Sequence, residues 1–431
     1  MFELNQDQRE AVDRLHDFVK DPTKKFFVIK GYAGVGKSSS IQRFLRETDR
    51  NCILTSPTHK ACRVLRQMRD EIGSDHVNVQ TIHALLGLRP NKDSHKMEFS
   101  PIGENQAEQF QVVVVDEGSM VSTELFEQIR DTAYSENVKF IFMGDPLQLP
   151  PVREEISPVF AIPDQVELTK VMRHDNQILN LATELRHSIL EGRRPNLRTD
   201  NDENGGVYCL NWRRMRQQIK RGYKSDAYAA NPNTFRTVAW TNKTVHMYNE
   251  MIREFIYDTE DLPKFSEGER VVMCQPVVDL EKKLSCSDFS GFLFHTDDEA
   301  TVEQIEVVYH PIYRDLKCYR MHCQPDYSDE MNPVWAIHED SERDYQRLLS
   351  DLSEKARSRQ GSWGSFWDAK ESVIDVRPCH AITSHRSQGS TYETVFVDAQ
   401  DILRNPNESE ALRCLYVAAS RAKKNVILQT S

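Results

Sequence analysis

The sequence has no long apolar run. Nowhere among its 431 residues do eighteen apolar residues follow one another, and about that many are needed to cross a bilayer as a helix. The first ten residues, MFELNQDQRE, contain neither the apolar core of a signal peptide nor an Arg-rich amphipathic pattern. A secreted or membrane-spanning protein is therefore not expected.

Cysteine is too scattered to build a metal site or a disulfide framework. The nine cysteines include no C-x-x-C pair, and the two nearest in sequence are Cys318 and Cys323. These thiols are expected to be reduced, which is typical of a cytoplasmic protein.

Positive charge is also in short supply. The chain has 55 Lys and Arg against 66 Asp and Glu, a net charge of −11. Such a chain has no overall positive field to attract a polyanion, so a nucleic-acid partner would have to bind in a local groove. The length suits two or three domains.

Short apolar runs that alternate with helical patterns dominate the first 170 residues. Four of these runs are expected to be buried strands: Phe26–Ile29, Cys52–Leu54, Val112–Val115 and Lys139–Met143. The pattern returns late in the chain, at Thr237–Trp240, Val395–Val397 and Val426–Leu428. The sequence therefore predicts an α/β fold with two parallel sheets, each covered by helices on both faces.

Two stretches interrupt this pattern. Residues 251–365 carry glycines, prolines and short strand-like runs such as Arg270–Met273 and Ile305–Tyr309, which predicts a small antiparallel insertion. Residues 88–110 are polar, with two prolines and a glycine, and are expected to form a protruding hairpin.

The strongest motif is a phosphate-binding loop. It runs from Gly31 to Ser38 and satisfies G-x-x-x-x-G-K-S between a predicted strand and a predicted helix. Gly31, Gly34 and Gly36 let backbone N–H groups converge on phosphate oxygens, and the helix adds the positive end of its dipole. Lys37 is expected to reach the β and γ phosphates of a nucleotide, and the Ser38 hydroxyl to bind magnesium.

A carboxylate pair follows the valine run at the carboxyl edge of the same predicted sheet. Asp116 is suited to hold magnesium and Glu117 to polarise the attacking water as general base. Alone, such a pair is usually a solvated turn; beside a phosphate loop it becomes a candidate hydrolytic pair. For Gln148, spacing alone favours a structural turn, and arginines such as Arg173 and Arg421 usually lie on solvated faces, so these three residues gain catalytic weight only from the motifs considered next.

Several further motifs, taken in chain order, resemble those of superfamily-one helicases of the RecD-like class, and most closely the phage Dda-type helicases. The resemblance runs over nearly the whole chain. Its motifs are the Leu4-Asn5-x-x-Gln8 segment, 55-TSPTHKA-61, 81-TIH-83, 116-DEGS-119, 144-GDPLQLPP-151, 168-LTxVxR-173, 239-AWTNK-243, 366-FWDAK-370, 383-TSHRSQG-389 and 416-YVAASRA-422.

The resemblance implies two RecA-like motor domains. The first comprises residues 1–87 and 111–180 and carries a pin hairpin at 88–110; the second comprises 181–250 and 366–431 and carries an SH3-like β insertion at 251–365. ATP and Mg²⁺ would bind between the motor domains, with catalytic roles for Lys37, Glu117, Gln148, Arg173 and Arg421. The residues expected to hold nucleotide or metal are Gln8, Gly31, Gly34, Gly36, Lys37, Ser38, Ser39, Asp116, Gln388 and Gly389.

The same resemblance implies a single-stranded DNA track and a strand-separating wedge. The DNA candidates are Thr58, His59, Thr81, His83, Asn242, Trp367, Thr383 and His385, although His83 and Trp367 would be core residues on composition alone. Met97 or Phe99 would stand at the tip of the pin, and Phe99 could equally anchor the hairpin.

The resemblance further implies a monomeric 5′-to-3′ DNA helicase that acts at junctions of single and double strands. It also implies possible replication or recombination partners, in host cytoplasm if the protein is phage-encoded. An ATPase that displaces bound proteins without sustained unwinding is the alternative, and a nucleotide-dependent switch is a third reading.

Overall fold

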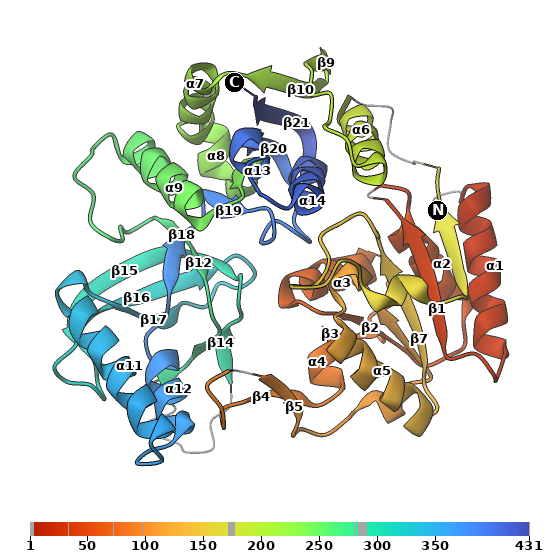
Figure 1. Ribbon diagram of the computed structural model, residues 1–431, viewed down its shortest axis with the longest axis horizontal. Coiled ribbons are helices and arrows are strands. Elements are labelled where there is room, and N and C mark those ends of the chain that lie inside the picture. The colour runs from red at the N-terminus through yellow and green to blue at the C-terminus, as the bar shows by residue number, and fades with distance from the viewer. Residues whose placement is uncertain are drawn as a thin grey trace. The chain divides into compact units, whose positions relative to one another are not determined.

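The chain's strands and helices are arranged around three main sheets (Figure 1). The computed structural model describes residues 4–32, 34–71, 73–96, 98–170, 177–280, 282 and 291–430. Contacts divide the chain into two units. The first unit is Met1–Arg89, Pro101–His246 and Ile382–Ser431, and the second is Pro90–Ser100 and Met247–Ala381.

The first sheet of the first unit is parallel, with strand order β3-β2-β6-β7-β1-β8. Its strands are β1 (Phe26–Gly31), β2 (Cys52–Ser56), β3 (Asn78–Thr81), β6 (Val112–Val115), β7 (Lys139–Gly144) and β8 (Gln165–Leu168). All four β6 valines are buried, as expected for a central strand with helices on both faces.

Separate cores form on the two faces of this sheet. Helices α1 (Gln6–Lys20), α2 (Lys37–Glu47) and α3 (His59–Glu71) contribute to one core; α4 (Ile82–Leu85), α5 (Thr123–Ser135) and η3 (Pro158–Ala161) contribute to the other. Two short 3-10 helices, η1 (Ala107–Gln109) and η2 (Gly118–Met120), flank β6.

The second sheet of this unit has the order β19-β11-β20-β21-β10-β9. Its strands are β9 (Asp200–Asp202), β10 (Gly205–Leu210), β11 (Phe235–Ala239), β19 (Ala381–Thr383), β20 (Tyr392–Val397) and β21 (Ala422–Gln429). β11, β20, β21 and β10 pair in parallel, and β9 adds an antiparallel edge. The predicted class, two RecA-like α/β sheets, is confirmed.

Helices and one 3-10 turn surround this second sheet. They are α6 (Gln177–Glu191), α7 (Trp212–Tyr223), α8 (Asp226–Ala230), η4 (Pro232–Thr234), α13 (Ala399–Ile402) and α14 (Glu408–Ser420). Helix α9 (Asn242–Tyr257) begins in the first unit and continues into the second. Leu147 and Leu149, which follow β7 of the first sheet, are buried in the same core as β20, β21 and α14. The two sheets of the first unit therefore share a packed interface beside the 144–151 turn.

The second unit is built on an antiparallel sheet of order β17-β16-β15-β12-β18. Its elements are β12 (Arg270–Met273), β13 (Val277–Val278), β14 (Phe292–Phe294), β15 (Glu299–Tyr309), β16 (Lys317–Pro325), β17 (Asn332–Ile337), η5 (Glu339–Ser341), α11 (Glu342–Arg357), α12 (Trp363–Glu371) and β18 (Val376–Pro378). Because β18 pairs with β12, this sheet extends beyond residue 365, where the sequence placed the end of the insertion.

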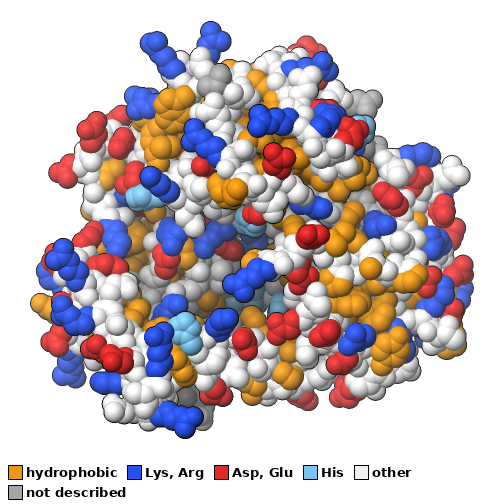
Figure 2. Space-filling model, viewed as in Figure 1, with side chains coloured by type: hydrophobic (Ala, Val, Ile, Leu, Met, Phe, Trp, Pro, Cys, Tyr) orange, Lys and Arg blue, Asp and Glu red, His pale blue; other side chains and the backbone are white. Residues whose placement is uncertain are grey.

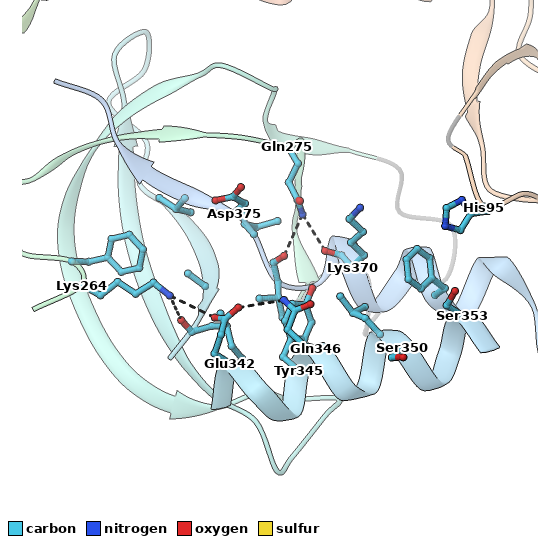
Figure 3. A pocket seen from close by; sticks show the side chains of 18 residues that line it. His95, Lys264, Gln275, Glu342, Tyr345, Gln346, Ser350, Ser353, Lys370 and Asp375 are labelled. Atoms are coloured by element: carbon cyan, nitrogen blue, oxygen red, sulfur yellow. Dashed lines mark hydrogen bonds and ion pairs between the residues drawn. The ribbon is translucent and has the colours of Figure 1, made fainter. Parts of the chain in front are cut away.

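A pocket of about 680 Å³ lies in this second unit between α11 and the strands (Figure 3). Polar bonds brace its walls: Gln275 Nε2 donates to the carbonyls of Lys370 and Val373, and Lys264 Nζ donates to the Ile337 carbonyl at 2.9 Å. Basic and acidic side chains both line the pocket, so charge favours no one class of ligand.

Candidate active site and nucleic-acid interface

The phosphate loop joins the end of β1 to the start of α2. Gly34 and Gly36 have φ values of 87° and 86°, a conformation open to glycine at little cost. Gly36 is the N-cap of α2 and offers no side-chain cap, so the first turn of α2 keeps N–H groups available for an anion. Lys37 Nζ lies over the loop and donates to the carbonyls of Gly31 at 2.6 Å and Tyr32 at 3.0 Å.

Gln8 braces this loop from α1. Its Nε2 donates to the Val35 carbonyl at 3.2 Å, and its Oε1 accepts from the Asn5 N–H at 3.0 Å as part of a capping box. The side chain is buried and held on both sides. Ser38 is exposed and Ser39 is half-buried on the first turn of α2. Nucleotide contacts by Gln8, Ser38 and Ser39 stay predictions.

The carboxylate pair lies at the carboxyl end of β6. Asp116 Oδ1 accepts from the Glu117 N–H at 2.8 Å. Glu117 has φ 52° and ψ 46°, a left-handed conformation that is uncommon outside glycine and often marks functional sites. Burial raises the pKa of Asp116. Burial and then the Asp116 charge raise the pKa of Glu117 to about 7, against the opposing effects of Arg421 and Lys37.

These residues fit a magnesium ion that would arrive with the nucleotide. Carboxylate and hydroxyl oxygens are ligands that Mg²⁺ prefers, and Asp116 and Ser38 supply one of each. Gln148 gives an independent observation: its buried Oε1 has no hydrogen-bond partner within the described ranges. A buried acceptor without a partner is costly, and a donor such as a water molecule bound beside the nucleotide would satisfy it.

The second sheet supplies Arg421 and the 388–389 loop to this site. Arg421 is 6% exposed; its guanidinium donates to the carbonyl of Val417 at 3.1 Å and to Ser420 Oγ at 2.9 Å. Its charge lowers the pKa of Glu117, so the two groups interact. A Cβ built on Gly389 would lie 4.0 Å from Glu117 Oε1. Gly389 and Arg421, which are far from Glu117 in the sequence, thus lie close to its carboxylate.

Two residues of α14 to which the sequence assigned no role hold the 145–148 turn. Arg413 donates to the carbonyls of Pro146 at 2.7 Å and Gln148 at 2.8 Å. The Tyr416 hydroxyl donates to Asp145 Oδ2 at 2.7 Å. The available signal was an arginine and a tyrosine three residues apart within the apolar run 411–419, because such spacing puts both side chains on one face of the helix.

The three threonines among the DNA candidates share one local structure. Each lies at or just after the carboxyl end of a strand and caps the turn that follows: Thr58 Oγ1 accepts from Ala61 N at 3.2 Å, Thr81 Oγ1 from Ala84 N at 3.2 Å, and Thr383 Oγ1 from Arg386 N at 3.3 Å. A hydroxyl that accepts in this way still has its proton to donate. The geometry is suited to a phosphate oxygen.

The other DNA candidates of the first unit lie on the same kinds of turn. Asn242 is exposed at the start of α9, a start fixed by Asp401, which accepts from the N–H groups of Trp240 and Thr241 at 2.9 Å each. Burial lowers the pKa of both His83 and His385, so both rings are neutral at pH 7. His59 begins α3, and its contact with DNA stays a prediction.

Trp367 belongs to the second unit and has a structural role there. It is 7% exposed, and its Nε1 donates to the Ser94 carbonyl at 2.9 Å. Beside it, Lys92 Nζ pairs with Glu371 Oε2 at 2.5 Å, and the rings of His95 and Trp363 lie 5.2 Å apart. These contacts leave Trp367 little surface for a base.

The predicted hairpin contains a two-stranded sheet of β4 (Leu88–Asn91) and β5 (Glu98–Pro101). Phe99 on β5 is 47% exposed. Met97 and Arg173, two of the predicted functional residues, lie outside the described residues.

The raised pKa of Glu117 predicts a pH dependence. A general base must be ionised, so a pKa near 7 means that activity is present above about pH 7 and is lost as pH falls below it. With saturating single-stranded DNA, kcat/KM for ATP should fall about tenfold per pH unit below that value. A profile that is flat from about pH 5.5 to 8 would contradict Glu117 as the base with this pKa.

The phosphate loop, the carboxylate pair and an arginine from a second RecA-like sheet define a P-loop NTPase with two motor domains. An AAA-domain model matches residues 3–209, and a model of the UvrD-like helicase C-terminal domain matches residues 378–429. These two matches support a superfamily-one helicase of the Dda-like type.

Relatives span its whole length. The ATP-dependent DNA helicase Dda of Enterobacteria phage T4 is 24% identical over 457 residues, covering 98% of each chain. An uncharacterised protein of Acanthamoeba polyphaga mimivirus is 25% identical over 490 residues, covering 98% of this chain and 99% of that protein. The crystal structure of Pif1 helicase from Candida albicans covers all of this chain and 95% of that one, with TM-score 0.51 and 15% identity, which shows a shared fold.

No helix in the described ranges is both long enough and apolar enough to cross a membrane.

Proposed function

We propose that this protein is an ATP-driven DNA helicase that moves 5′-to-3′ along single-stranded DNA and separates duplex strands ahead of it. The observation that carries the proposal is the meeting of Glu117 from the first sheet with Arg421 and Gly389 from the second. A hydrolytic base and a charge-stabilising arginine on different sheets make turnover depend on how the two sheets approach each other.

Different side chains of the protein perform the separate tasks of ATP hydrolysis. Lys37 and the open N–H groups of α2 bind the β and γ phosphates. Glu117 orients and deprotonates the attacking water, and Arg421, together with Arg173, spreads the charge that develops on the γ-phosphate. Ser38 and Asp116 would hold the magnesium ion that comes with the nucleotide, and this ion would supply positive charge to neutralise part of the phosphate charge.

The α14 contacts give a route from hydrolysis to movement. We expect the buried Oε1 of Gln148 to accept from a water molecule beside the γ-phosphate, and the Gln148 carbonyl is held by Arg413 of α14. Loss of the γ-phosphate would therefore change the hold of α14 on the first sheet. Because Thr58 and Thr81 lie on the first sheet and Thr383 on the second, the distance between the strand-gripping turns would change in each cycle.

The names of the related proteins support DNA as the partner. T4 Dda is named an ATP-dependent DNA helicase, and Bacteroides Pif1 has been crystallised with ADP-AlF3 and single-stranded DNA. We extend from these relatives the 5′-to-3′ direction, action as a monomer at junctions of single and double strands, and a replication or recombination role in an infected cell's cytoplasm.

Strand displacement on tailed duplexes tests this proposal. A duplex with a 5′ single-stranded tail should be unwound with ATP, and a 3′-tailed duplex of the same sequence should not. Unwinding of only the 3′-tailed substrate would overturn the direction, and unwinding of neither would overturn the helicase.

An ATPase that displaces DNA-bound proteins is the alternative function. It would show DNA-stimulated hydrolysis and streptavidin displacement from a biotinylated single strand, with no unwinding of either tailed duplex. The exposed Phe99 of the β4–β5 hairpin favours the helicase, because an apolar ring at the surface can stack on a base pair at the junction.

Replacing Phe99 by alanine should slow unwinding several-fold while single-stranded-DNA-stimulated hydrolysis changes little, since stacking contributes about 1–3 kcal/mol per base. Phe292→Ala is a matched control, because Phe292 is 48% exposed and lies on β14, outside the two hairpin strands. Equal losses of unwinding and hydrolysis in Phe99→Ala would contradict a wedge role.

A further inference from the structure

The helix α7 carries an unusual concentration of positive charge. Six of the thirteen residues from 212 to 224 are basic, and no acidic residue occurs between 204 and 225. All six are exposed: Arg213, Arg214, Arg216, Lys220, Arg221 and Lys224. In Figure 2 basic side chains project from the top of the molecule, where Figure 1 draws α7. The positive charge of this surface contrasts with the net charge of −11 of the whole chain.

The basic residues form a stripe. Arg213, Arg216, Lys220 and Lys224 follow one another at spacings of three, four and four residues, which places them on one side of a helix. Arg214 and Arg221 lie beside this stripe. The opposite side of α7 buries Met215 and Ile219, so the helix is fixed to its domain and its basic face is turned to solvent.

Helix electrostatics account for only part of this arrangement, because the dipole favours Lys220 and Arg221 in the last turn of α7 but not the cations at its start. Like charges three or four residues apart destabilise a helix, and cations in the first turn oppose the helix dipole. Arg213 and Arg214 lie in that first turn, which contains no acidic residue. The side chains of Arg213, Arg214 and Arg221 take part in no ion pair among the described residues.

Helix α11 shows what a solvated helix of this chain looks like. It carries Glu342 and Asp344 in its first turn and Lys355 and Arg357 in its last, as the dipole favours. Within it, Arg347 pairs with Asp344 at 3.0 Å. The single-sign face of α7 is therefore not the general pattern of exposed helices here.

The surface is separate from the predicted strand track. Thr383 and His385 follow β19, at one edge of the second sheet, whereas α7 follows β10, next to the other edge. The last turn of α7 packs inward, where the Tyr223 hydroxyl bonds Thr237 Oγ1 at 3.2 Å.

We propose that the basic face of α7 binds the phosphate backbone of nucleic acid at a second site outside the motor cleft. The proposal rests on the DNA helicase function above, which supplies the polyanion. Four of the six cations are arginines, whose planar guanidinium groups bind phosphate in a bidentate way. Twelve helical residues span roughly 18 Å, so several successive phosphates of one strand lie within reach. The backbone could belong to the duplex arm or to a single-stranded tail.

The test compares two triple variants of equal charge. Arg213→Gln, Arg216→Gln and Lys220→Gln remove three charges of the stripe; Arg343→Gln, Arg347→Gln and Lys355→Gln remove three exposed cations from α11. Kd is measured by fluorescence anisotropy against a blunt duplex, oligo(dT) and polyglutamate over a range of KCl concentrations. Circular dichroism and ATPase activity without DNA, which should both be unchanged, establish that each variant is folded.

The α7 variant should lose at least about tenfold in nucleic-acid affinity at low salt, and its slope of log Kd against log salt should fall by about 2–3, as expected for three lost phosphate contacts. The α11 variant should keep wild-type values. An effect confined to the duplex assigns the site to the duplex arm, and one confined to oligo(dT) assigns it to a single-stranded tail.

Unchanged slopes for both nucleic acids would overturn the proposal, and a loss of polyglutamate binding alone would replace nucleic acid by an acidic protein partner. These results are distinguishable from a failure of the helicase function, which would show as a wild type whose ATPase ignores DNA.

Discussion

Replacing Glu117 by glutamine is expected to reduce the rate of DNA-stimulated ATP hydrolysis by about 10²–10⁴-fold, the usual contribution of a general base. Glutamine keeps the size of the side chain but cannot accept the proton of the attacking water. The nearby Lys37 and the phosphate loop are untouched, so ATP affinity should stay within a few-fold of wild type. Single-turnover hydrolysis and equilibrium binding of a fluorescent ATP analogue measure the two quantities separately.

Glu127→Gln is the matched control, because Glu127 is exposed on α5 and takes part in no described interaction. It should leave both quantities at their wild-type values. If Glu117→Gln retained more than about a tenth of the wild-type rate, Glu117 could not be the principal base.

Arg421→Ala is expected to slow hydrolysis by about 10³–10⁵-fold, the range found for arginines that stabilise a transferring phosphoryl group. The buried guanidinium interacts with Glu117 and is held by the Val417 carbonyl and Ser420 Oγ, so its position is fixed before substrate arrives. Preorganised charge of this kind contributes more than mobile charge, because it needs no reorganisation during the reaction. The quantity to measure is kcat with saturating ATP and DNA.

Arg404→Ala serves as the control for Arg421, because Arg404 is an exposed arginine of the same domain. Thermal unfolding of both variants checks that loss of a buried arginine has not simply unfolded the protein. A folded Arg421→Ala protein with near-normal kcat would remove Arg421 from the catalytic group.

The central strands could be predicted because their burial on both faces demands continuous apolar residues. Val112–Val115 became β6 with the predicted bounds, and Arg270–Met273 became β12. The edge strands β3 and β8 escaped prediction, since Asn78–Thr81 and Gln165–Leu168 are short and partly polar. Strand β9 pairs antiparallel with β10 at the edge of the second sheet. Its sequence, Asp200–Asp202, consists of three polar residues, so no apolar pattern predicted a strand there.

The roles of individual side chains were harder to predict, because they depend on partners distant in sequence. Trp367 bonds a carbonyl 273 residues away, and Arg413 bonds one 267 residues away. Local spacing contains no information on such pairs. The phosphate loop and the carboxylate pair could be located because their chemistry requires consecutive residues at the end of a strand.

The most direct test of the motor is ATP hydrolysis with and without single-stranded DNA, for the wild type, Lys37→Ala and Glu117→Gln. The structure predicts strong stimulation of the wild type by DNA and loss of hydrolysis in both variants. Slow hydrolysis by the wild type that does not respond to DNA would contradict a DNA-coupled motor and favour a nucleotide-dependent switch.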